Sequence, residues 1–79
     1  MLNENIEENI KFRKRLGEKI KSHRLKKDSS QHDLSIESDM ARTQISRIEN
    51  GIISTTVVSF VNIIKALELT DEQILDLLK

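Results

Sequence analysis

The sequence has no cysteine, proline, tryptophan or tyrosine, and only two glycines and two phenylalanines. Without cysteine it can form neither disulfides nor thiolate metal sites, so apolar packing must hold any folded domain together. The two glycines, Gly17 and Gly51, offer little of the turn chemistry that β-hairpins use. These absences favour an all-α fold, and 79 residues are enough for one small domain.

A secretory leader and a long apolar run are also missing. The chain opens with polar and acidic residues where a signal peptide would be basic. The longest mostly apolar stretch, residues 57–69, is interrupted by Asn62 and Lys65 among others, so it is not expected to span a membrane. We therefore expect a cytoplasmic protein with no membrane partner.

No residue pattern typical of an enzyme is present. His23 and His32 are the only histidines, and neither has a nucleophile or clustered carboxylates near it in the sequence. The two glycines form no phosphate-binding loop. We expect no catalytic residue, no metal and no cofactor, and we do not expect an enzyme.

Charge is balanced overall but unevenly distributed. Residues 11–27 hold nine of the thirteen lysines and arginines and a single acid, Glu18. Residues 28–79 hold four basic and nine acidic residues. This asymmetry suggests a basic surface for a polyanion on an otherwise acidic body, with a solvated basic helix as the alternative.

Apolar spacing and capping residues predict five helices, of which two precede residue 40. Residues 5–27 carry apolar side chains at intervals of three or four and form one long helix or two abutting ones. Gly17 lies inside this segment, although glycine costs about 1 kcal/mol relative to alanine in a helix. Ser30 is a good N-cap for a second helix, in which Leu34 and Ile36 are expected to face inward.

Three more helices are expected after the polar turn that follows. The third runs from Arg42 to Asn50 and ends at Gly51, which can adopt the left-handed conformation. The fourth covers residues 57–67 and is the most apolar part of the chain. A fifth begins after Thr70, where Gln73 completes a capping-box pattern.

Several short segments occur together in an order typical of one family. From Leu16 to Leu69 the chain resembles the Xre-type helix-turn-helix domains, the family of lambda Cro and the phage repressors. The segments that carry this resemblance are Leu16-Gly17-Glu18-Lys19-Ile20, Arg24, Ser30-Gln31-x-x-Leu34, Ile45-Ser46-Arg47-Ile48-Glu49-Asn50-Gly51 and Ile63-Ile64-Lys65-Ala66-Leu67-Glu68-Leu69.

The resemblance implies an all-α, five-helix domain of the repressor type. Residues 13–79 would form the helix-turn-helix domain and residues 1–12 an N-terminal helical extension. Asp39 stands where the turn of the family usually has glycine, and aspartate tolerates left-handed geometry better than most residues. Ala41 replaces the usual serine or threonine cap of the third helix, a loss of about 1 kcal/mol.

The resemblance also makes the third helix the recognition helix, which enters the major groove of DNA. Arginine can bind guanine through two hydrogen bonds, glutamine can bind adenine in the same way, and a threonine methyl can touch that of thymine. An ordinary polar helix face is the alternative. The residues expected to read base edges are Arg42, Thr43, Gln44, Ser46 and Arg47.

The resemblance also implies which residues contact the DNA backbone. Ser30 and Gln31, at the start of the second helix, and Asn50 are expected to bind DNA phosphates, with simple capping as the alternative for Ser30. The loop at residues 51–55 lacks the basic residues of many relatives, so we expect a weak grip on the DNA backbone there.

A structural ion pair is implied as well. Arg24 and Glu49 match a pair that in the family forms a buried salt bridge between the first and third helices. Removal of either partner would leave a buried charge without a counterion. A loss of binding on mutation would therefore not demonstrate a DNA contact.

The expected function is sequence-specific binding of double-stranded DNA as a homodimer, with a palindromic operator and regulation of transcription as a repressor or controller. Restriction–modification controller proteins look similar through Thr56-Val57-x-Ser59-Phe60. The residues expected at the dimer interface are Val57, Val58, Val61, Ile64, Ile74, Leu77 and Leu78.

The sequence is also consistent with other interfaces and other functions. The N-terminal apolar residues Leu2, Ile6, Ile10 and Phe12 are a second candidate interface, or they pack on their own domain. An antitoxin of the same fold would use the apolar C-terminal helices to bind another protein. A helical adaptor without a role at DNA would not need Arg42 or Arg47.

Overall fold

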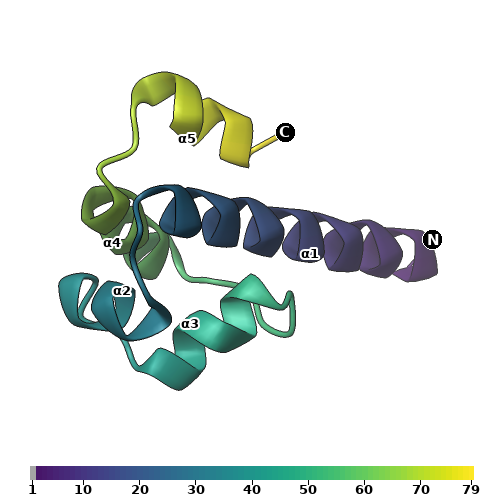
Figure 1. Ribbon diagram of the computed structural model, residues 1–79. Helices are drawn as coiled ribbons and strands as arrows, with labels where there is room; N and C mark the ends of the chain where they lie inside the picture. Colours follow the sequence, from purple (N-terminus) through teal and green to yellow (C-terminus); the bar gives the residue numbers. More distant parts are fainter. Residues whose placement is uncertain (1) are drawn as a thin grey trace.

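A computed structural model describes the backbone of residues 2–79 and the side chains of residues 6–79. This part of the chain is all-α: α1 (Leu2–Lys26), α2 (Gln31–Glu37), α3 (Arg42–Glu49), α4 (Val57–Leu67) and α5 (Asp71–Leu77). In Figure 1, α1 is a single rod whose N-terminal end projects from the body, with α2 and α3 on one side of it and α5 on the other. The five-helix, all-α prediction is therefore confirmed.

The first helix has no break at Gly17 and none at residue 12. The segment at residues 5–27 therefore forms one helix rather than two. The expected division between an extension at residues 1–12 and a domain at residues 13–79 does not coincide with a helix end, and it stays a prediction. None of the described helices is long and apolar enough to cross a membrane.

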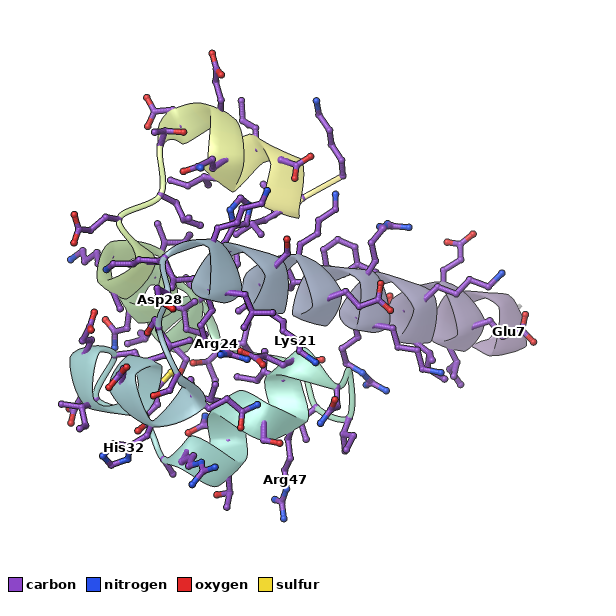
Figure 2. The ribbon with its side chains drawn as sticks, in the orientation of Figure 1. Glu7, Lys21, Arg24, Asp28, His32 and Arg47 are labelled. Carbon is purple, nitrogen blue, oxygen red and sulfur yellow. The ribbon has the colours of Figure 1, made fainter. Side chains whose placement is uncertain are left out.

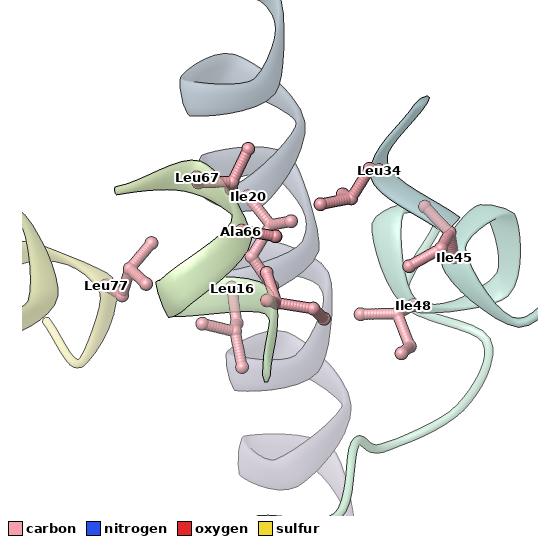
Figure 3. Close-up of a cluster of buried hydrophobic side chains, with 9 residues drawn as sticks. Leu16, Ile20, Leu34, Ile45, Ile48, Ala66, Leu67 and Leu77 are labelled. Carbon is pink, nitrogen blue, oxygen red and sulfur yellow. The ribbon is translucent and has the colours of Figure 1, made fainter. Parts of the chain in front are cut away.

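The hydrophobic core lies around the C-terminal half of α1. Figure 3 shows its side chains converging from α1, α2, α3, α4 and α5. They are Leu16, Ile20, Leu34, Ile45, Ile48, Ile63, Ala66, Leu67 and Leu77. Leu77 is only 1% exposed, so its expected place in a dimer interface is wrong. The helical repeat of α5 turns Leu77 into the core, whereas Leu75 and Leu78 face outward.

The predicted helix caps explain where the short helices begin. At the start of α2, Ser30 Oγ accepts a hydrogen bond from the Asp33 backbone N–H at 2.9 Å, and the Asp33 carboxylate accepts one from the Ser30 N–H at 3.1 Å. Hydrogen bonding from the Ser30 backbone lowers the pKa of Asp33. Thr70 and Gln73 form the same capping box at the start of α5.

Ile36 is the one expected core residue of α2 that faces solvent, with 66% of its surface exposed. The inner face of this short helix is filled by Leu34 together with two small polar residues, Ser35 and Ser38. Both hydroxyls donate to backbone carbonyls, Ser38 to that of Leu34 at 2.6 Å. The serines can therefore be buried at little cost because their polar atoms are satisfied within the helix.

Left-handed residues mark the ends of the helix pair. Asp39 has φ 56° in the turn before α3, as expected of a residue that stands in place of glycine. Gly51 has φ 71° directly after α3. Ala41 makes no side-chain hydrogen bond to the start of α3, so that helix begins without a side-chain cap.

At Gly17 the backbones of α1 and α3 lie in close contact. A Cβ atom on Gly17 would lie 2.6 Å from the backbone oxygen of Glu49 and 2.9 Å from its carbonyl carbon. Real Cβ atoms do not approach backbone atoms at such distances. Glycine is therefore required here by the packing of the two backbones rather than by an unusual φ angle.

Two lysines of the basic segment attach α1 to the C-terminal ends of other helices. Lys19 Nζ donates to the Asp76 backbone oxygen of α5 at 2.6 Å, and Lys27 Nζ donates to the Ala66 backbone oxygen of α4 at 2.5 Å. Lys27 also pairs with Glu68 at 3.2 Å. These ends have free carbonyl groups and the negative pole of the helix dipole, so a lysine stabilises them. These two lysines of the basic segment thus stabilise the folded domain.

Candidate nucleic-acid interface

The third helix has one buried and one polar face. Ile45 and Ile48 anchor α3 to the core. Figure 2 shows Arg47 pointing away from the body of the molecule. Five residues of this helix were expected to read bases. Arg42, Thr43 and Arg47 are exposed, and Gln44 and Ser46 are half-buried.

Behind the C-terminal end of α3 lies a buried ion pair. Arg24 donates from Nε to Glu49 Oε2 at 2.6 Å and from Nη2 to Glu49 Oε1 at 2.9 Å, and the two side chains are 7% and 1% exposed. Figure 2 shows Arg24 on the side of α1 that faces α3. The hydrogen bond with Glu49 raises the pKa of Arg24, so the guanidinium stays charged.

This ion pair also joins the start of α2 to the end of α3. Gln31 Nε2 donates to Glu49 Oε1 at 3.1 Å, and Arg24 Nη1 donates to the Ser29 carbonyl at 2.8 Å. Within the described side chains no buried polar atom lacks a partner. The network therefore fixes the positions of two helix ends on one side of the molecule.

The residues expected to bind phosphate occupy those two helix ends. Ser30 is exposed, and its hydroxyl is occupied by the cap of α2. Gln31 is half-buried and places its amide between Glu49 and solvent. Asn50 is exposed at the end of α3, where its Nδ2 lies 3.4 Å from Ser46 Oγ. Polar groups of α2 and α3 thus meet at the C-terminal end of α3.

α1 contributes basic residues beside the loop that follows α3, which was not expected from the sequence. Arg13 Nε donates to the Gly51 carbonyl at 3.0 Å, and Lys14 crosses Gly51 so closely that a Cβ there would lie 2.6 Å from its Cγ. The spacing of residues along α1 could have indicated this contact. Arg13, Gly17 and Arg24 are separated by four and seven residues, which places them on one face of α1.

On the other side of the molecule, α4 and α5 expose an apolar surface, which we call the α4–α5 patch. Val57 and Val58 are 79% and 70% exposed, and Val61, Leu75 and Leu78 are exposed as well. The patch also includes the half-buried Ile64 and Ile74, of which Ile64 packs partly against the core. Leu75 was not among the residues expected at an interface. Contiguous exposed apolar side chains are typical of protein–protein contacts.

The N-terminal apolar residues lie partly beside this patch. Phe12 lines a cleft together with Val57, Phe60 and Leu78, and the Arg15 guanidinium lies 5.7 Å from the centre of its ring. Ile6 is exposed and Ile10 half-buried. Leu2 lies outside the residues whose side chains are described.

The two histidines lie on different helices. His23 is half-buried on α1, and His32 is exposed on α2. The described side chains include no group of three or more metal-ligating residues that could hold an ion.

Comparison with known proteins identifies the family. The model of a helix-turn-helix family matches residues 20–74, which is more than half of the chain. The chain belongs to the Xre-type helix-turn-helix family. The second and third helices, α2 and α3, are the pair that gives the family its name, and the resemblance found in the sequence is confirmed.

Solved structures of restriction–modification controller proteins are similar to this helix-turn-helix chain. Wild-type C.Esp1396I is 34% identical, with a TM-score of 0.77 over 85% of this chain and 86% of that one. C.AhdI from Aeromonas hydrophila is 22% identical, with a TM-score of 0.72 over 76% and 91%, and shows the fold alone. A C.Esp1396I tetramer bound to its natural 35 base-pair operator is 34% identical, with a TM-score of 0.73 over 86% and 96%. No curated protein sequence gives a significant match.

Proposed function

We propose that this helix-turn-helix protein binds a palindromic operator in double-stranded DNA as a homodimer in the cytoplasm and thereby regulates transcription as a repressor or controller. The observation that carries the proposal is the exposed polar face of α3, which Ile45 and Ile48 hold rigidly against the core. A helix of this size fits the major groove, where side chains can distinguish base pairs.

Each group on this side of the molecule has a role in the proposal. Arg42 and Arg47 would bind guanine edges, with Thr43 against a thymine methyl and Gln44 and Ser46 as additional base contacts. The exposed start of α2, at Ser30 and Gln31, would hold one phosphate through backbone N–H groups and the glutamine amide. Asn50, at the end of α3, would hold a second phosphate.

The operator complex of C.Esp1396I supports this assignment. That protein is 34% identical to this one and binds its operator as a tetramer. A protein that recognises symmetric DNA needs two recognition helices about one helical turn apart, so a single domain must pair with a second copy.

We expect the double variant Arg42→Ala, Arg47→Ala to lose sequence-specific binding while it remains folded. Each bidentate arginine–guanine contact contributes about 1–3 kcal/mol of discrimination, which corresponds to roughly 5- to 150-fold. Site selection from a random duplex library should enrich a two-fold-symmetric sequence with the wild type and none with the variant.

Circular dichroism should show that the variant is folded, because both arginines are exposed. Enrichment of the same site by wild type and variant would exclude α3 as the reading helix. A wild type that selects no site would contradict the proposed function itself.

We also propose the α4–α5 patch as the dimer interface. Replacement of Val58 by aspartate places a charge on this patch, and burying an unpaired carboxylate costs several kcal/mol. The variant should therefore be monomeric at concentrations at which the wild type is a dimer, as measured by sedimentation equilibrium.

Ile36→Asp is a matched control, since Ile36 is equally exposed but lies on α2. A dimer that survives in the Val58 variant would place the interface elsewhere. A wild type that stays monomeric without DNA would instead favour the alternative in which this patch binds another protein, as in an antitoxin.

A further inference from the structure

The loop that follows α3 has no basic residue of its own, but basic side chains from another helix lie beside it. Residues 51–55 are Gly, Ile, Ile, Ser and Thr. The basic groups come from α1, whose Arg13 and Lys14 lie against Gly51. In Figure 1 this loop turns back beneath the middle of α1.

The contact of Arg13 and Lys14 with Gly51 lies next to the residues of α3 that are proposed to bind DNA bases. Gly51 directly follows Asn50, the C-cap of α3, and the Ile52 N–H donates to the Arg47 carbonyl at 2.9 Å. The loop is therefore tied to the last turn of α3. When a helix lies in the major groove, its ends approach the phosphate backbones that form the walls of the groove.

The two side chains retain the capacity to bind an anion. In the described part of the chain, the guanidinium of Arg13 makes one hydrogen bond, through Nε, and forms no ion pair. Its two Nη groups remain as donors. Lys14 is exposed and also forms no ion pair among the described residues. An arginine held in place by one hydrogen bond can present the rest of its planar fork to a phosphate.

We propose that Arg13 and Lys14 bind backbone phosphates of the DNA beside the C-terminal end of α3, and so provide from α1 the positive charge that the loop at residues 51–55 lacks. The inference rests on the proposed DNA binding, and it overturns the expectation of a weak grip at this place. Arg13 and Lys14 are the basic residues of α1 that the described contacts place against Gly51. Lys19 and Lys27 are held by α5 and α4, and Arg24 is buried with Glu49.

The test is the salt dependence of binding to the operator selected by the wild type. The variant is Arg13→Gln, Lys14→Gln, in which the glutamine at position 14 keeps part of the aliphatic stem that crosses Gly51. The control is Arg15→Gln, Lys26→Gln. Helical spacing places Arg15 and Lys26 on the side of α1 opposite Gly17, so the control removes the same charge away from α3.

Each phosphate contact contributes about 0.9 to the slope of log affinity against log salt concentration. A dimer carries two copies of each residue, so the variant should flatten the slope by roughly 3.6 and the control by less than about 1. The variant should weaken binding to operator and to random duplexes by the same factor, since a phosphate contact reads no base.

An unchanged slope in the variant, with specific binding by the wild type, would overturn the inference and leave the proposed function intact. Equal flattening in variant and control would also overturn it, because the effect would then be one of net charge. If the wild type binds no DNA at low salt, the proposed function fails and this inference with it. Should thermal melting show that Arg13→Gln disturbs the fold, Lys14→Gln alone should still flatten the slope by about 1.8.

Discussion

Replacement of Gly17 by alanine is expected to destabilise the protein by about 2–3 kcal/mol or more, even though alanine is the better helix former. The intrinsic preference for alanine amounts to about 1 kcal/mol in the opposite direction. The added methyl group decides the outcome, because it would meet the backbone of Glu49 at 2.6 Å. Backbone atoms cannot rotate away as the end of a side chain can, so α1 and α3 must separate.

That separation would weaken several contacts together. Ile48 and the Arg24–Glu49 ion pair both lie where the two helices meet, and all three side chains are buried. For a domain of this size, a loss of 2–3 kcal/mol is a large part of a total stability of about 5 kcal/mol.

The measurement is urea unfolding followed by circular dichroism. Ser22→Ala is the control, because Ser22 is an exposed residue of the same helix and its replacement should be neutral or slightly stabilising. An unfolding midpoint of Gly17→Ala equal to that of the wild type would show that the two backbones are not in close contact.

The second large effect is expected at the buried ion pair. Glu49→Ala should destabilise the protein by about 3–5 kcal/mol, because Arg24 would be left charged and buried without its carboxylate. Gln31 would lose its acceptor in the same substitution. Because an arginine side chain keeps its proton in proteins, the Arg24 guanidinium cannot escape the penalty by losing its charge near neutral pH.

The double variant Arg24→Met, Glu49→Leu distinguishes two effects on stability. One is the cost of burying a single charge, and the other is the net contribution of the ion pair to the free energy of unfolding. Two apolar residues of similar size often replace a buried ion pair with no loss, so this variant should recover most of the stability lost by Glu49→Ala. Urea unfolding of both variants and the wild type provides the comparison. A double variant as unstable as Glu49→Ala would show that the ion pair itself is required for the fold.

This pair of variants also separates folding from binding. Neither Arg24 nor Glu49 lies on the outer face of α3, so the double variant should still select the wild-type DNA site if it is folded. If Glu49→Ala alone fails to bind DNA, that failure shows only that the protein is unfolded.

Much of the fold could be predicted because the local signals agree with each other. Ser30 and Thr70 have the side chains that cap helices, and the structure begins α2 and α5 immediately after them. Asp39 and Gly51 stand where left-handed residues are required. Such positions depend on neighbours in the sequence, so a single sequence is enough to identify them.

Packing across long distances could not be predicted in the same way. Leu77 and Leu78 are adjacent and equally apolar, and only the docking of α5 on α1 decides that the first is buried and the second exposed. The basic segment 11–27 looked like one charged surface. In the structure its residues separate by helix face into lysines that cap other helices, a buried arginine and the pair beside Gly51.

The lysine contacts of α1 have a consequence for how the protein acquires its structure during synthesis. The ribosome makes α1 first, but its partner at Ala66 lies 39 residues after Lys27 and its partner at Asp76 lies 57 residues after Lys19. Until those residues have left the exit tunnel, α2 and α3 can pack on α1, but α4 and α5 cannot yet cover their part of its apolar side. The core is therefore completed only late, once the C-terminal helices have emerged.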